Sequence, residues 1–131
     1  MKIPWKLKIV SVYYIVMINK YIVSGFLLFL LGQAMIWYQT NSQFFSSWAK
    51  DHPYVMAAAG WPISYILIYA TGFVVKGFDG ALWPGRLVGF ASGMAVMAFF
   101  TYIHMGEGIN MKTGVTLLLA LAITMIQVFW K

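Results

Sequence analysis

The sequence contains no cysteine and few charged residues. Without a thiol, the chain forms no disulfide and offers neither a thiolate metal ligand nor a cysteine nucleophile. Charged residues make up 9% of the chain, whereas a soluble domain carries about 25%. In contrast, 62% of the 131 residues are hydrophobic, and the mean hydropathy is +0.79. The composition therefore predicts an all-α integral membrane protein that lacks the polar sequence needed for a soluble catalytic module.

Four apolar runs predict the membrane spans, because each is close to the length of about 20 residues that crosses a bilayer core. They cover residues 21–39, 54–75, 87–103 and 113–129. Only elements that satisfy their own backbone hydrogen bonds are stable in lipid, so we expect a four-helix transmembrane bundle over residues 21–131. Pro62 lies inside the second run and is expected to kink that helix, because proline removes one backbone donor.

Residues 1–20 form a basic leader with a short apolar run. We interpret this segment as an amphipathic helix that lies on the lipid headgroups, with Trp5, Tyr13 and Tyr14 as interfacial anchors. In the alternative, the segment extends the first span and Lys20 snorkels to the membrane surface. The sequence leaves both arrangements open.

The basic residues are distributed unevenly between the two predicted sides of the membrane. One side holds both termini and the second loop, with Lys2, Lys6, Lys8, Lys20, Lys76, Arg86 and Lys131, and the other side holds Lys50 and Lys112. Because lysine and arginine collect on the cytoplasmic side, we expect both termini in the cytoplasm and the chain in the cell (inner) membrane. The net charge of +6 thus indicates contact with the lipid bilayer and not with nucleic acid.

Acidic residues are missing from the middle of every predicted span. Asp51, Asp79 and Glu107 fall in predicted loops, and His104 lies at the edge of the third span. Transport and catalysis inside a membrane commonly use an ionisable group at depth, so the pattern argues against a proton-coupled antiporter with a buried acid. No catalytic or phosphate-binding motif occurs. We expect no enzymatic activity, no cofactor and no metal. Both histidines, Asp51 and Glu107 are expected to form hydrogen bonds at the membrane interface; in the alternative they meet as a metal-binding cluster of loop residues.

One helix face in each of the first two spans carries the polar and aromatic side chains. Gln33 is the strongly polar residue inside the first span, and Trp37 shares its face at a spacing of four. This face should turn inward, since a side-chain amide in hydrocarbon seeks a partner. In the second span, Tyr65 and Tyr69 share a face near Trp61. We expect these five residues to line a cavity for a small-molecule substrate; in the alternative they only link helices.

The third span carries a ridge of glycines. Gly85, Gly89 and Gly93 form two overlapping G-x-x-x-G patterns. This spacing builds a flat groove in which another helix backbone packs closely. The pattern predicts a helix-packing face and leaves open whether the contact lies within the chain or between subunits.

Two short motifs are similar to a known family of membrane proteins. Phe100 to Ala120 read F-x-Y-x-x-M-G-E-G-I-N-x-K-T-G-x-x-L-x-L-A. This pattern resembles the last hairpin of the drug/metabolite transporter superfamily, in which a Gly-Glu turn precedes a final helix rich in small residues. The first span adds G-Q-A-M-I-W-Y, from Gly32 to Tyr38, which looks like a small four-helix family related to the small multidrug resistance proteins.

The resemblance implies a four-helix subunit that works as a dimer or larger homo-oligomer and moves lipophilic cations, metabolites or lipid-linked sugars. The small multidrug resistance proteins carry in the first span a Glu that binds both proton and drug. The comparable helix here offers Gln33, which does not ionise, so drug–proton exchange by that route is not expected. The lysine bias also argues against an antiparallel dimer of dual topology. Two other function classes stay open: a non-transporting accessory subunit that docks a partner on the glycine ridge, and an oligomeric pore.

Overall fold

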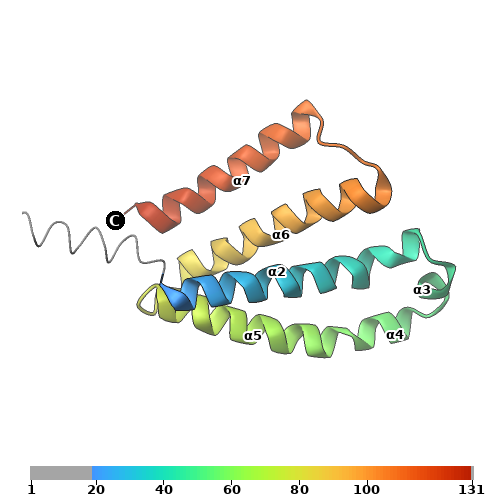
Figure 1. The fold of residues 1–131 in the computed structure, drawn as a ribbon, viewed down its shortest axis with the longest axis horizontal. Helices are drawn as coiled ribbons and strands as arrows, with labels where there is room; N and C mark the ends of the chain where they lie inside the picture. The colour runs from blue at the N-terminus through green and yellow to red at the C-terminus, as the bar shows by residue number, and fades with distance from the viewer. Residues whose placement is uncertain (1–18, 131) are drawn as a thin grey trace, which may run out of the picture.

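The computed structural model describes residues 19–130, which form a helical bundle without strands (Figure 1). Four of its segments are long and apolar enough to cross a membrane, namely Lys20–Phe44, Pro53–Gly77, Leu82–Met105 and Met111–Phe129. The prediction of an all-α membrane protein with four spans is therefore confirmed. The expected interfacial helix over residues 1–20 falls outside the described residues, except for its last two positions.

The first two spans pack closely along their length. They are α2 (Lys20–Asn41) and the helix pair α4 (Pro53–Ala58) and α5 (Gly60–Gly77), connected through η1 (Ser42–Phe44) and α3 (Ser47–Asp51). A Cβ atom on Gly25 of α2 would lie 2.8 Å from the carbonyl oxygen of Ala70, and one on Gly32 would lie 2.6 Å from a methyl of Leu67. Glycine at these two positions thus lets the α2 backbone approach α5. The buried cluster beside them consists of Phe29, Ala70, Val74 and Val88.

The second span is interrupted, as Pro62 predicts, and the interruption lies at Ala59 between α4 and α5. Pro62 has no N–H to donate to the carbonyl four residues earlier, and its ring crowds that position. A side chain from α2 bonds to the backbone next to the break: Gln39 Nε2 donates to the carbonyl oxygen of Met56 at 2.8 Å. The break therefore has a partner in the neighbouring helix.

The third span is α6 (Leu82–Met105), and it begins five residues before the predicted start at position 87. The preceding turn contains Asp79 and Gly80, which both have positive φ angles, 53° and 89°. Pro84 falls in the first turn of α6, where a missing N–H breaks no helical hydrogen bond. The predicted start at position 87 leaves Pro84 in the preceding loop, and the structure corrects this. As a consequence, Arg86 lies in the second turn of α6 and not in a loop.

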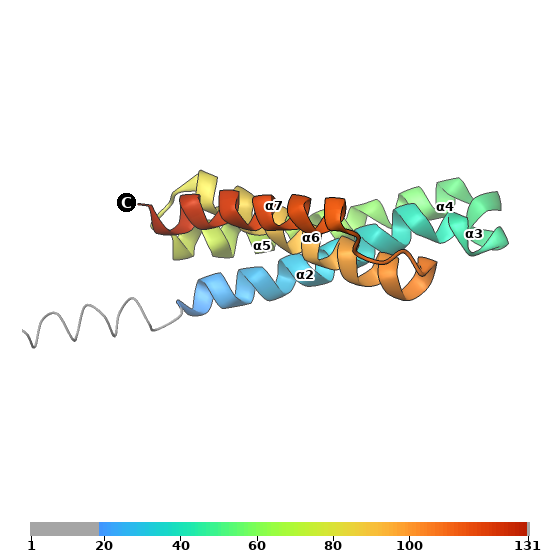
Figure 2. The ribbon, with the colours of Figure 1, turned by 90° about the horizontal axis from the view of Figure 1, so that it is seen from above.

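The fourth span, α7 (Met111–Phe129), lies on the outer side of α6, away from α5 (Figures 1 and 2). Asn110 caps its first turn by accepting a hydrogen bond from the Thr113 N–H at 2.9 Å. Among the described helices, α7 packs against α6 alone. Buried Ala120 and Thr124 form the contact, and the Thr124 hydroxyl donates to the Leu87 carbonyl at 3.4 Å. The remaining surface of α7 is exposed and mostly apolar, with the polar residues Lys112, Thr116 and Gln127 near its two ends.

Candidate functional site

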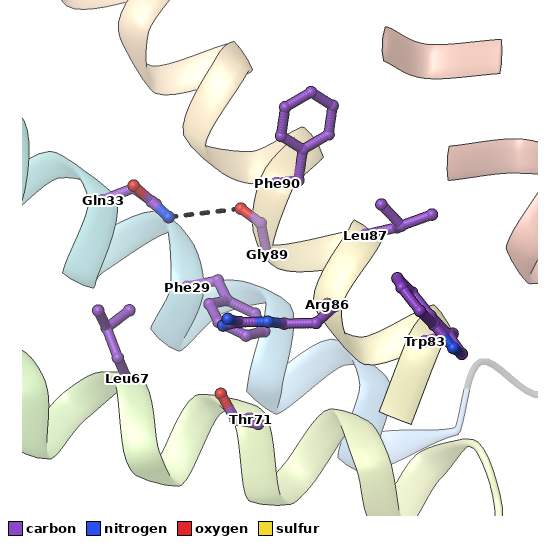
Figure 3. A pocket seen from close by; sticks show the side chains of 9 residues that line it. All are labelled: Phe29, Gln33, Leu67, Thr71, Trp83, Arg86, Leu87, Gly89 and Phe90. Atoms are coloured by element: carbon purple, nitrogen blue, oxygen red, sulfur yellow. Dashed lines mark hydrogen bonds between the residues drawn. The ribbon is translucent and has the colours of Figure 1, made fainter. Parts of the chain in front are cut away.

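A cleft of about 460 Å³ lies between α2, α5 and α6 (Figure 3). Its size falls in the range of about 300–1,000 Å³ that is typical of small-molecule sites. Its wall is mostly apolar, with three polar side chains, one from each helix: Gln33, Thr71 and Arg86. The complete lining is Phe29 and Gln33 from α2, Leu67 and Thr71 from α5, and Trp83, Arg86, Leu87, Gly89 and Phe90 from α6.

Gln33 faces this cleft, and its amide spans the contact between α2 and α6. Gln33 Nε2 donates to the Gly89 carbonyl oxygen at 3.4 Å (Figure 3). The same carbonyl accepts a hydrogen bond from the buried Ser92 hydroxyl at 2.7 Å. The absence of a side chain at Gly93 leaves room for the amide, since a Cβ there would lie 3.1 Å from Gln33 Oε1. The inward orientation expected for Gln33 is thus present, and its partner is the α6 backbone.

Arg86 is the ionisable residue of the cleft, and the sequence interpretation missed its role. Its side chain extends from α6 toward Phe29 of α2 (Figure 3). No residue that lines the cleft is acidic, and within residues 19–130 Arg86 forms no ion pair. The available signal was Pro84: proline is favoured in the first turn of a helix, which places Arg86 one turn inside α6.

Trp37 does not line the cleft. Its indole is 3% exposed and is surrounded by the rings of Tyr38, Phe45, Phe100 and His104, with centroids 5.0 to 6.0 Å away. Its Nε1 donates to the Thr101 hydroxyl at 3.2 Å. The residue therefore turns inward, but as part of a packed contact between α2 and α6 and not of a cavity.

The three aromatic residues predicted on the second span also lie elsewhere. Trp61, Tyr65 and Tyr69 are 87%, 62% and 50% exposed, and the two tyrosine hydroxyls share a hydrogen bond of 3.3 Å. Within the single chain these three residues do not join Gln33 in one cavity, and their place in a cavity of the homo-oligomer stays a prediction. The reason is steric: the backbones of α2 and α5 approach at Gly25 and Gly32, which leaves room for aliphatic side chains and turns the aromatic face of α5 outward.

The glycine ridge of α6 packs within the chain. A Cβ at Gly85 would lie 3.1 Å from a methyl of Val75, and one at Gly89 would lie 3.0 Å from the Phe29 ring. Gly93 faces Gln33, as described above. The question that the sequence left open is therefore answered: α2 and α5 of the same chain occupy the ridge.

The two histidines do not meet as a loop cluster. His52 stacks on Trp48 with centroids 4.7 Å apart, and His104 lies in the aromatic contact around Trp37. Within residues 19–130, no three His, Asp or Glu side chains gather in a metal-binding arrangement. Asp51 and Glu107 are both exposed. Asp51 is the last residue of α3, and Glu107 lies in the loop between α6 and α7.

Comparisons with protein-family models, with curated proteins and with solved structures find no match to this chain. The resemblance to the drug/metabolite transporter superfamily therefore rests on residues 32–38 and 100–120.

Proposed function

We propose that this chain binds and moves a small solute across the cell (inner) membrane, as a homo-oligomer of the drug/metabolite transporter type. The observation that carries the proposal is the cleft, in which an amide, a hydroxyl and a guanidinium from three different helices converge on an apolar space. Convergence of a few polar groups in an apolar pocket is typical of small-molecule sites. Because the walls belong to three separate helices, a small tilt of one helix changes access to the site.

The charges at the end of the bundle nearest the cleft support a cytoplasmic position for that end. Lys20 and Lys76 lie over the ring of Tyr21, with ammonium-to-centroid distances of 5.3 and 4.4 Å. Arg86 lies in the second turn of α6 at the same end of the bundle. With the positive-inside bias, this arrangement supports cytoplasmic termini.

The isolated subunit leaves large apolar surfaces that support assembly with further copies. α7 contacts α6 alone among the described helices, and the outer face of α5 carries exposed Trp61, Tyr65 and Tyr69. In the family that the chain resembles, one four-helix bundle is half of the usual transporter. The accessory-subunit alternative relied on the glycine ridge as a docking surface, but that ridge is occupied by α2 and α5.

A flux experiment tests the proposal. The purified chain is reconstituted into liposomes, and accumulation of a cationic, an anionic and a neutral amphipathic dye is measured. We expect at least one dye to accumulate, and Gln33→Leu to reduce its uptake about tenfold, since an apolar side chain leaves the polar edge of the site without a partner.

Tyr65→Phe is the matched control, because it removes a hydroxyl from the outward face of α5. It should leave both uptake and oligomer size unchanged. Absence of uptake for all three dyes would contradict the transport proposal and favour an accessory subunit. Steady ion current from the protein in a planar bilayer would instead indicate a pore.

A further inference from the structure

We infer that the cleft takes an amphipathic anion, whose negatively charged group pairs with Arg86. The inference rests on the proposed function and names the substrate class of the same site. It starts from a charge that the described chain leaves without a counter-charge.

A guanidinium stays protonated in proteins, so Arg86 brings a permanent positive charge into the cleft. A charge at the edge of the hydrocarbon region is costly unless it is paired or hydrated. The side chains that line the cleft are neutral, and Arg86 has no carboxylate within 4.0 Å among the described residues. Asp79 lies in the exposed turn before α6 and not in the cleft lining. Arg86 is exposed, so its guanidinium is open to a negatively charged group of a molecule that enters the cleft.

The polar groups around Arg86 fit the oxygens of a phosphate or carboxylate. Arginine presents planar N–H donors that bind such groups in a bidentate manner. The Thr71 hydroxyl stands on the facing helix, and Figure 3 shows it directed into the same space as the Arg86 side chain. Within residues 19–130, the Thr71 hydroxyl takes part in no hydrogen bond, whereas Gln33 Nε2 donates to the Gly89 carbonyl and Gln33 Oε1 can only accept. The donors that the cleft offers to an anion are therefore the Arg86 guanidinium and the Thr71 hydroxyl.

The rest of the lining fits an apolar tail. Phe29, Trp83 and Phe90 contribute aromatic surface to the lining of the cleft (Figure 3), and Leu67 and Leu87 contribute aliphatic surface. The lipophilic cations implied by the family resemblance fit poorly here, because Arg86 repels a positive charge. The aromatic residues predicted to line a substrate cavity do not line this cleft: Trp37 is buried in a packed contact, and Trp61 and Tyr65 are exposed on α5.

A pair of probes with equal tails and opposite charges tests the assignment. The full chain in neutral maltoside micelles is titrated with decyl phosphate and with decyltrimethylammonium, and bound ligand is counted by native mass spectrometry. We expect the phosphate to bind and the ammonium not to bind. Arg86→Gln should weaken decyl phosphate binding about tenfold or more, which is the effect of losing a charge-assisted hydrogen-bonded pair. Arg86→Lys keeps the charge and should retain most of the binding.

Lys76→Gln is the matched control, because it removes a cation from the same end of the bundle outside the cleft lining. It should change binding by less than about twofold, as expected for an exposed and screened charge. An equal loss in Lys76→Gln and Arg86→Gln would overturn the assignment, and so would tight binding of the ammonium. If Arg86→Gln does not fold, the comparison of the two probes on the unaltered chain and on Arg86→Lys decides.

A further arm separates the two sources of such an anion. Dioleoyl phosphatidic acid is compared with dioleoyl phosphatidylcholine; Arg86-dependent binding of the former assigns the site to a membrane lipid. Arg86-dependent binding of decyl phosphate alone assigns it to a smaller solute, and both results support the anion. If a cationic or neutral dye is transported in a Gln33-dependent and Arg86-independent manner, the anion assignment fails while the proposed function stands. If no dye is transported and neither decyl probe binds, both fail.

Discussion

The contact between α2 and α6 has two ends that differ in how their polar groups are used. At the loop end, five rings from Trp37, Tyr38, Phe45, Phe100 and His104 fill the space, and Trp37 is almost fully buried. At the other end, the same two helices and α5 leave a cleft around Arg86. Side chains therefore fill the contact at one end only. The end that they leave open is the one at which polar groups lack a partner within the described chain.

Hydrogen bonds at the aromatic end form two short chains, one through His104 and one through Thr101. His104 Nδ1 lies 3.1 Å from the Phe100 carbonyl oxygen, which only accepts, so Nδ1 carries a proton. In the neutral ring, Nε2 is then the acceptor for the Tyr38 hydroxyl at 2.9 Å. Trp37 donates to the Thr101 hydroxyl, which in turn contacts the Met97 sulfur at 3.6 Å. Each polar group is paired, as stable helix contacts in lipid require.

The largest expected effect comes from breaking the aromatic end. Trp37→Ala removes a buried indole and leaves the Thr101 hydroxyl without its donor. We expect a loss of about 3 kcal/mol in the free energy of unfolding, the usual cost of such a core truncation. Denaturant titration in maltoside micelles, followed by circular dichroism, measures this loss.

Tyr54→Ala is the control for that experiment, because Tyr54 is 88% exposed on α4, outside the faces that support assembly. Its effect should stay within about 0.5 kcal/mol. Equal destabilisation by the two substitutions would show that the buried contact around Trp37 is not what closes this end of the bundle.

The next effect concerns the close approach of α2 to α5, which brings Thr71 and Leu67 to the cleft. Gly25→Ala would place its Cβ 2.8 Å from the Ala70 carbonyl oxygen, a backbone atom that cannot move aside alone. We expect a loss of about 1–3 kcal/mol from this overpacking. The measurement is again the free energy of unfolding in micelles.

Gly72→Ala provides the matched control on α5, because a Cβ there meets nothing within 4 Å. It should stabilise the protein by about 0.5–1 kcal/mol, since alanine has a higher helix propensity than glycine. If Gly25→Ala were also neutral or stabilising, the two helices would not pack as closely as described.

The sequence predicted the spans well, because hydrophobic length alone decides what crosses a bilayer. It also predicted that Gln33 turns inward, since a buried amide needs a partner. It did not predict that Trp61, Tyr65 and Tyr69 lie outside the cleft of the single chain, because the outside of a membrane helix is as apolar as its inside. Spacing therefore shows which residues share a face, but not which face meets a neighbouring helix.

The residues that decide which face of α5 packs inward lie on α2. Gly25 and Gly32 of α2 determine where α5 approaches, and these glycines do not form a G-x-x-x-G pattern. Arg86 was missed for a different reason: Pro84 is compatible with a turn and with the first turn of a helix. Only the folded structure shows that Pro84 lies in the first turn of a helix.

The smallest expected effect tests whether hydrogen bonding, and not ring packing alone, completes the aromatic end. Tyr38→Phe keeps the ring against Trp37 and Phe100 but removes the donor to His104 Nε2. We expect a loss of about 1 kcal/mol in the free energy of unfolding, the usual net value of one hydrogen bond. Tyr69→Phe removes a hydroxyl from the exposed 3.3 Å pair on α5 and should cost clearly less. A larger loss in Tyr69→Phe would mean that the outer face of α5 is itself a packed contact, as it would be in a homo-oligomer. The packing at the two ends of the bundle would then have to be compared in the assembly and not in the single chain.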